Sequence, residues 1–352
     1  MRTRLRFVWL AAFLAATATV LVAVSGTGAR TAAVGKIGIA TPEKANDKGW
    51  NQQGVQGAKN AAKAFGATVT VADGIGYENT EPVLRQLAQG GADLIIAQAS
   101  GYNTVAPRIG EEFQVPILTY DNPKGRKAPY VADIETVSQQ GAYLAGVLAG
   151  SMVSSSGRAP AAAGAANTIG IVISAADTNW YKQSGGFIAG ARSVNPKVKI
   201  LFAQVGQAAY ADAAGGKRTT QSLIAGGASV IFGMGDGASF GMLQAVETAA
   251  RNVLFIDVIG NKTSLDKKHR YLSSVIWDFT QVFKQAIRDV NAGKFGTHNY
   301  FLGVNDGISL LKTSLIPASV WTKIQTARAG LVSGRIHVPL TPTKAAVDKL
   351  LK

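Results

Sequence analysis

The chain has 352 residues, 47% of them hydrophobic, which is enough for one large domain or two ordinary domains with sizeable cores. The formal net charge is +15, but the basic residues are scattered and aromatic residues do not alternate with them, so we expect no nucleic-acid binding. The absence of cysteine excludes disulfide bonds, thiolate metal sites and a lipid on an N-terminal cysteine.

The first 33 residues have the composition of a secretory signal segment. Arg2, Arg4 and Arg6 precede an apolar stretch at 7–24, and small residues follow it. With Arg30, these arginines account for four positive charges, which leaves +11 for the rest of the chain. The stretch is also long enough for an uncleaved membrane anchor, so that alternative stays open. We expect a protein secreted across the cytoplasmic membrane, periplasmic or associated with the cell envelope, and not a lipoprotein.

Strand and helix patterns alternate along the rest of the chain. Short apolar or β-branched runs predict strands, and longer stretches with helical spacing predict the helices between them. The expected strands are 36–40, 68–72, 93–98, 115–120, 130–132, 169–173, 198–203, 230–233, 253–257 and 272–276. The expected helices are 50–65, 81–89, 103–113, 136–152, 182–193, 212–225, 239–251, 279–291 and 317–331. This alternation predicts parallel sheets with right-handed crossovers.

The second half of the chain repeats the pattern of the first. LRQLAQGGADLIIAQ at 84–98 is echoed by TQSLIAGGASVIFG at 220–233, and KIGIA at 36–40 by TIGIV at 168–172. Such a repeat predicts an α/β protein of two similar three-layer αβα lobes, joined by a hinge of several strands, with a ligand cleft between them. The expected lobes are 34–134 with 260–296, and 135–259 with 297–338, followed by a tail at 339–352.

The candidate site residues follow strands, because ligands meet open parallel sheets at the carboxyl ends of the strands. These loops combine aromatic rings, which stack on flat ligands, with carboxylates and amides, which bind polar edges. The candidates are Asp47, Trp50, Asn51, Gly101, Tyr102, Asp121, Trp180, Asp236, Trp277 and Asp278. Each tryptophan has packing as its alternative role, and each aspartate has helix capping or a turn, Asp47 and Asp121 especially.

The sequence contains none of the common catalytic motifs that we searched for. The three histidines lie away from the strand ends and lack metal-ligand spacing, and there is neither a phosphate-binding loop nor a nucleophile elbow. We therefore expect no enzyme, no catalytic residue, no metal and no cofactor.

Several segments together resemble one known family. They are DKGWNQQGVQGAKNA at 47–61, SGYNTV at 100–105, AYLAGVLAG at 142–150, GFIAGARSVNP at 186–196, ADAAGGKRTTQSLIAGGASVI at 211–231 and LSSVIWDF at 272–279. The chain is similar, in the same order from about 36 to 339, to the basic membrane protein family. These are PnrA-like solute-binding proteins of ABC importers with the type I periplasmic-binding fold.

The resemblance implies two lobes that close on a nucleoside or a related base. It places Asp47, Trp50 and Asn51 at the ligand, together with Gly101, Tyr102 and Asp121. The chain departs from the family where Val-Ile-Gly-Asn at 258–261 replaces a Val-Asp-x-Asp segment, and where Trp277 replaces a lysine. The usual ribose contacts are therefore not expected.

These observations predict an extracytoplasmic binding protein of an ABC importer. We expect a monomer that closes on a small planar ligand, with a purine nucleoside or nucleobase favoured, and that meets a membrane permease as its partner. Two alternatives remain open at this stage: a sugar- or polyol-binding protein of the same fold, and a ligand-sensing adaptor for a membrane receptor.

Overall fold

The structure is a computed structural model, and it describes residues 33–153 and 167–352. The expected signal segment, apart from Ala33, lies outside the described residues. The described residues, 33–153 and 167–352, fall within one compact unit. No helix in the described ranges combines the length and apolar character needed to span a membrane.

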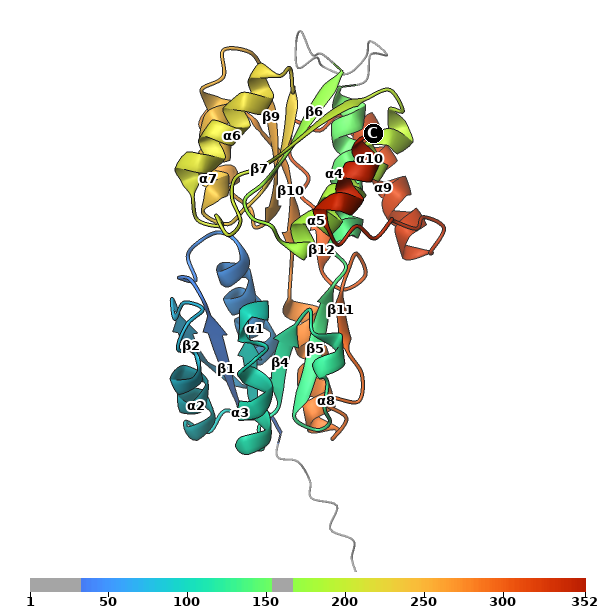
Figure 1. Cartoon of the computed structure of the whole chain (residues 1–352). Coiled ribbons are helices and arrows are strands. Elements are labelled where there is room, and N and C mark those ends of the chain that lie inside the picture. The colour runs from blue at the N-terminus through green and yellow to red at the C-terminus, as the bar shows by residue number, and fades with distance from the viewer. Residues whose placement is uncertain (1–32, 154–166) are drawn as a thin grey trace, which may run out of the picture. The chain divides into compact units, whose positions relative to one another are not determined.

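The first lobe is built on a six-stranded parallel sheet with the order β11-β5-β4-β3-β1-β2. Its strands are β1 (Lys36–Thr41), β2 (Thr68–Asp73), β3 (Leu94–Ala97), β4 (Ile117–Tyr120), β5 (Val131–Thr136) and β11 (Tyr300–Leu302). Its helices are α1 (Trp50–Phe65), α2 (Glu81–Gln89), α3 (Ala106–Glu112) and α8 (Thr280–Asn291). Helices α1 and α8 pack together, and so do α2 and α3, which gives three layers (Figure 1).

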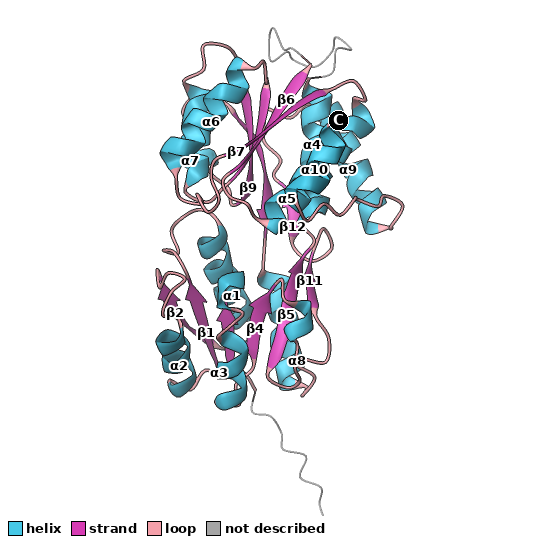
Figure 2. Cartoon of the chain, viewed as in Figure 1, coloured by secondary structure: helices cyan, strands magenta, loops and turns pink. Residues whose placement is uncertain are grey.

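The second lobe repeats this plan of a sheet covered by helices (Figure 2). Its strand order is β12-β10-β9-β8-β6-β7, and only β12 runs antiparallel. Its strands are β6 (Thr168–Ile173), β7 (Lys199–Gln204), β8 (Val230–Met234), β9 (Leu254–Ile259), β10 (Tyr271–Trp277) and β12 (Ile308–Leu310). Its helices are α4 (Ser138–Met152), α5 (Thr178–Val194), α6 (Ala213–Ala225), α7 (Ala238–Glu247), α9 (Ala318–Val332) and α10 (Lys344–Leu351). Helices α6 and α7 pack together, and α4 contacts both α5 and α9. The predicted α/β class with two lobes is confirmed.

The central strands are apolar along their whole length because helices cover both faces of each sheet. Every residue of β3, β4, β8 and β9 is buried, as expected for parallel strands inside a three-layer lobe. Glycine lets α4 and α5 approach closely, because a Cβ on Gly146 would lie 2.1 Å from the carbonyl oxygen of Phe187. Small residues thus let α4 and α5 pack directly on each other in the helix layer of the second lobe.

The lobe boundaries differ from the expected ones near the end of the chain. The chain crosses between the sheets after β5, after β10 and after β11, so the hinge has several segments. The sequence predicts that 260–296 belongs to the first lobe, but β10 pairs with β9 of the second sheet, and the crossing falls after Trp277. Strand β11 then pairs with β5 of the first sheet, although 297–338 is expected in the second lobe. Strand pairing depends on partners distant in sequence, which a local pattern does not identify.

Candidate functional site

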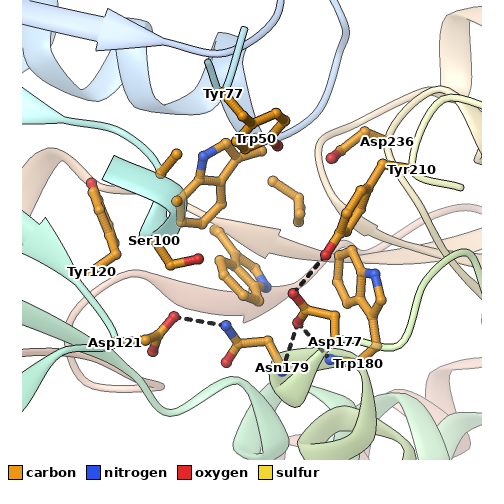
Figure 3. A pocket seen from close by; sticks show the side chains of 14 residues that line it. Trp50, Tyr77, Ser100, Tyr120, Asp121, Asp177, Asn179, Trp180, Tyr210 and Asp236 are labelled. Atoms are coloured by element: carbon orange, nitrogen blue, oxygen red, sulfur yellow. Dashed lines mark hydrogen bonds between the residues drawn. The ribbon is translucent and has the colours of Figure 1, made fainter. Parts of the chain in front are cut away.

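A cavity of about 260 Å³ lies between the carboxyl ends of the strands of the two lobes. Half of its lining comes from each lobe, and most of it is aromatic or acidic (Figure 3). The lining residues are Trp50, Tyr77, Ala99, Ser100, Gly101, Tyr120, Asp121, Asp177, Asn179, Trp180, Tyr210, Asp236, Ile259 and Trp277. The cavity therefore lies at the place that the parallel sheets predict for a ligand.

Trp50 is held rigidly at one wall of the cavity. It is the first residue of α1, and its indole N–H donates a 2.7 Å hydrogen bond to the backbone oxygen of Gln98. Its ring packs edge-on against Tyr120, Trp277 and Phe279, with centroids 5.1, 5.8 and 5.3 Å away. Edge-to-face packing of this kind favours one fixed ring orientation. The cavity thus has a preformed aromatic wall.

Asp47 and Asn51, two predicted site residues, do not line the cavity but fix the start of α1. One carboxylate oxygen of Asp47 accepts from the backbone N–H groups of Gly49 and Gln52, at 2.9 and 3.0 Å. The other accepts from the backbone and side-chain nitrogens of Asn51, at 3.1 and 2.7 Å. Asp47 therefore acts as a helix cap, and it places Trp50 by fixing the turn on both sides of it.

Two further predicted residues also lie outside the cavity. The hydroxyl of Tyr102 is buried and donates a 2.8 Å hydrogen bond to the backbone oxygen of Gly76. Asp278 accepts a 2.9 Å hydrogen bond from the backbone N–H of Thr280 at the first turn of α8. Gly101, beside Tyr102, does line the cavity, and a Cβ there would come within 2.8 Å of the Tyr77 ring.

The first turn of α5 forms the opposite wall. Asp177 caps this helix by accepting from the backbone N–H groups of Asn179 and Trp180, at 2.7 and 3.3 Å. Its second carboxylate oxygen accepts a 2.9 Å hydrogen bond from the hydroxyl of Tyr210 (Figure 3). This cap begins α5 four residues before the expected start at 182, and so places Trp180 within the helix.

Hydrogen bonds connect the two lobes directly beside the cavity. The side-chain amide of Asn179 donates to the carboxylate of Asp121 at 2.8 Å, and the hydroxyl of Thr136 donates to the Asn179 amide oxygen at 2.6 Å. Thr136 ends β5, where the chain first leaves the first lobe. Burial raises the pKa of Asp121, and its hydrogen bonds with Asn179 and Thr136 oppose that rise. The site is therefore a closed cleft with polar cross-links near its hinge.

Asp236 follows β8 and supplies a carboxylate from the second lobe to the cavity. Burial raises its pKa to about 7, with smaller contributions from the negative charges of Asp47 and Glu43. Its Oδ1 atom is buried and has no hydrogen-bond partner among the described residues. That oxygen therefore lacks a protein donor, while the backbone N–H of Trp50 opposes part of the rise in the pKa of the carboxyl group.

Two indole N–H groups at the cavity also lack a hydrogen-bond partner among the described residues. The Nε1 atoms of Trp180 and Trp277 are buried without a partner in the described parts of the chain. By contrast, the Nε1 atom of Trp50 is bonded to the backbone. Buried polar groups are nearly always hydrogen-bonded, so these unpartnered N–H groups are available to a molecule inside the cavity.

The structure places six of the ten predicted residues at the cavity: Trp50, Gly101, Asp121, Trp180, Asp236 and Trp277. Besides Tyr120, which ends β4, two aromatic lining residues are not among the candidates, Tyr77 and Tyr210. They follow the edge strands β2 and β7, whose downstream loops also end at the carboxyl edge of a sheet. An aromatic residue after an edge strand was the signal that would have identified them. The described residues contain no cluster of histidine, cysteine or acidic residues able to hold a metal ion.

Two α/β lobes around a polar and aromatic cavity define the class of two-lobed solute-binding proteins. The chain belongs to the family of PnrA-like ABC transporter substrate-binding proteins, whose sequence profile matches residues 34–333. Proteins of this family bind solutes for ABC transporters and are not enzymes. The resemblance noted in the sequence is therefore confirmed.

Individual relatives are distant. A protein named transcriptional activator protein med, from Bacillus subtilis, is 20% identical over 293 residues, covering 82% of this chain and 86% of its own. An uncharacterized lipoprotein of Pyrococcus horikoshii is 26% identical over 207 residues, covering 57% of this chain and 49% of its own length. A putative ABC transporter glucose-binding protein of Haloferax volcanii is 22% identical over 244 residues, covering 68% of this chain and 56% of its own.

Solved structures support the same fold. An ABC transporter solute-binding protein from Conexibacter woesei superposes with a TM-score of 0.72 at 23% identity, covering 87% of this chain and 99% of its own. A second, from Aeropyrum pernix, gives a TM-score of 0.74 at 18% identity, covering 90% and 96%. These likenesses establish the architecture that places the cavity between the lobes.

Proposed function

We propose that the cavity binds a small planar ligand, with a purine nucleobase or nucleoside favoured. One observation carries the proposal: two indole N–H groups, from Trp180 and Trp277, and one carboxylate oxygen, from Asp236, are buried at the cavity without protein partners among the described residues. A ligand with two acceptors and one donor would satisfy all three. Purines present ring-nitrogen or carbonyl acceptors and N–H or amino donors on one flat frame.

The aromatic walls support a flat ligand. Trp50 packs edge-on against Tyr120 and Trp277 in the first wall. Trp180 and Tyr210 lie in the second wall. Aromatic side chains stack on nucleobases with about 1–3 kcal/mol for each base. The volume of about 260 Å³ is just below the usual range for small-molecule sites, which favours a ligand with few atoms.

Closure of the lobes is the proposed mechanism. The bond between Asn179 and Asp121 joins residues of opposite lobes, so it forms only when the cleft is closed. A ligand stabilises the closed form by the difference between its affinities for the closed and open forms. The closed form would then be the species that an ABC permease receives, as in other hinge-closing binding proteins.

A sugar is the second candidate ligand. The Haloferax relative is named as a glucose-binding protein, and sugar rings also pack on indole groups while their hydroxyls bind carboxylates. Hydroxyl groups both donate and accept, so they would satisfy the same three atoms. The two candidates differ in whether the ligand is planar.

The test begins with protein purified from cells without denaturation, whose bound molecules are identified by mass spectrometry. Calorimetry on ligand-depleted protein then compares adenine, hypoxanthine, adenosine, inosine and glucose. We expect a purine to bind, and the free base to bind at least as tightly as its nucleoside. Binding of glucose alone would favour the second candidate, and binding of none of the five would contradict the purine proposal.

We also propose that the protein is exported without a lipid anchor. The Pyrococcus relative is named a lipoprotein, whereas this chain has no cysteine to carry a lipid. Fractionation of cells, with mass spectrometry of the mature N-terminus, tests this proposal. A covalently bound lipid would contradict it.

A further inference from the structure

The C-terminal segment lies beyond the part of the chain that matches the family, which ends at residue 333. It runs along the second lobe and ends in α10, which packs on α5 (Figure 1). The sequence predicts only a tail at 339–352 here. Val347 of α10 is fully buried, so this segment is part of the packed structure of the lobe.

Thr341 makes a buried contact between this segment and α5. Its side chain is 4% exposed, and its hydroxyl donates a 2.7 Å hydrogen bond to the backbone oxygen of Tyr181. The contact requires a glycine on the facing helix, because a Cβ on Gly185 would lie 2.1 Å from the Thr341 hydroxyl oxygen. The first turns of α5 are therefore shaped to receive this one side chain.

A second contact holds the other end of the same helix. The guanidinium of Arg192 donates to the backbone oxygen of Leu350, in the last turn of α10. Eleven residues separate Tyr181 from Arg192, which is about 16 Å along a helix. A helix held at two points this far apart cannot easily slide or rotate on its sheet.

The first turn of α5 is also the part that enters the ligand site. Asn179 and Trp180 line the cavity, and Tyr181, the next residue, holds the turn through Thr341 and through a 2.9 Å hydrogen bond from its own hydroxyl to Gln204 of β7. Trp180 has no hydrogen-bond partner of its own for its indole N–H among the described residues. The position of that N–H is therefore set by its neighbours in the turn.

We propose that Thr341 is a positioning residue for the ligand site, and that it acts through Tyr181 to hold the indole of Trp180 in place. Its effect on affinity rests on the proposed function, because it requires a ligand in the cavity. Its effect on the turn itself does not, and can be measured in the free protein.

The test compares three variants of the full chain. Thr341→Val keeps the shape but removes the hydroxyl, and Thr341→Ser keeps the hydroxyl. The control, Thr326→Val, changes an exposed threonine of α9 whose hydroxyl bonds only within its own helix. Hydrogen exchange of a peptide covering residues 178–185 reports local opening without a ligand. Calorimetry with hypoxanthine, or with whichever purine binds the wild type, reports affinity.

We expect Thr341→Val to speed exchange in 178–185 by about tenfold and to weaken purine binding by about fivefold, the effect of losing one buried hydrogen bond. Thr341→Ser should restore both, and Thr326→Val should change neither. Unchanged exchange in Thr341→Val, or a loss that Thr341→Ser does not restore, would overturn the positioning role. If no purine binds the wild type, the proposed ligand is wrong, while the exchange data still decide whether Thr341 holds the turn.

Discussion

Asn179 of the second lobe donates a 2.8 Å hydrogen bond to Asp121 of the first lobe, and the same amide accepts a 2.6 Å bond from Thr136 at the hinge. The backbone of Asp121 is in the left-handed region, with φ of 54°, so its side chain is directed by an uncommon turn. The side chain of Asn179, at the start of α5, is therefore bonded to two residues of the first lobe, so its bonds depend on how the two lobes are placed relative to each other. These bonds link the geometry of the hinge to the geometry of the cavity.

Replacing Asn179 by alanine should weaken ligand binding. The closed form would lose a hydrogen bond to a buried carboxylate, which contributes about 1.5–3 kcal/mol, so the affinity should fall by at least about tenfold. Calorimetry measures the affinity, and small-angle scattering measures how far the lobes close. The matched control is Asn60→Ala, on the exposed side of α1. Equal affinities for the two variants would contradict a cross-lobe role for Asn179.

Replacing Trp277 by phenylalanine separates ligand binding from stability. The indole N–H of Trp277 has no acceptor among the described residues, so its removal leaves no protein group unpaired. We expect the free energy of unfolding to fall only through the smaller volume of the buried ring, with no loss from a broken hydrogen bond, and the affinity to fall by about fivefold to tenfold.

Trp50→Phe is the control for Trp277→Phe, because it removes the bond from Nε1 to the buried backbone oxygen of Gln98. It should lower the free energy of unfolding by about 1–2 kcal/mol. Urea denaturation and calorimetry of both variants test this contrast. A Trp277→Phe protein that binds ligand as the wild type does would remove Trp277 from the hydrogen-bonding set.

Asp236 should make stability depend on pH. Because burial raises its pKa to about 7, the folded protein holds a proton on this carboxyl that the unfolded chain releases above about pH 4. Its contribution to stability is therefore greatest at about pH 4 and is lost as the pH rises to about 7. The Asp236→Asn variant stays neutral, so its stability relative to the wild type should increase over that range.

Urea denaturation at intervals from about pH 4 to pH 8 measures this difference. Asp348→Asn, which changes a partly exposed carboxylate of α10, is the control, and it should show no such rise. Parallel stability curves for Asp236→Asn and the wild type would show that Asp236 titrates normally.

A buried ion pair should be essential for the second lobe. The ammonium of Lys262 lies 2.8 Å from Asp257, and both side chains are almost completely buried. Lys262→Met would leave the carboxylate of Asp257 buried without its counter-charge, which costs about 3–5 kcal/mol. Changing both residues, as in Asp257→Leu with Lys262→Met, should cost less than the single change. Urea denaturation measures the free energy of unfolding of both variants. A double variant that is less stable than Lys262→Met would contradict this account.

Much of the architecture follows from local patterns. The Gly-Gly-Ala turns at 90–92 and 226–228 end α2 and α6 and lead into the buried strands β3 and β8, as the repeated sequence predicts. Alternation of apolar runs and helical spacing was sufficient to predict these helices and strands, because each element buries its own apolar residues in the core of its lobe. The same order of segments also identifies the family.

The roles of the aspartates needed the tertiary structure. Asp47, Asp236 and Asp278 all follow strands, yet Asp47 and Asp278 bond to the backbone N–H groups of nearby helix starts, whereas Asp236 keeps a free oxygen at the cavity. Which donors surround a carboxylate depends on the path of the chain around it. The residue type and its position after a strand do not distinguish these environments.

The sequence by itself determined the class of fold, the doubling of the lobe and the strand ends that line the cavity, because these depend on periodicity within short segments. The tertiary structure decided that β10 and β11 pair in opposite sheets, that Thr341 reaches α5, and that Asn179 meets Asp121. Each of those contacts joins residues far apart in the chain, and only packing and hydrogen bonding across the folded protein select them.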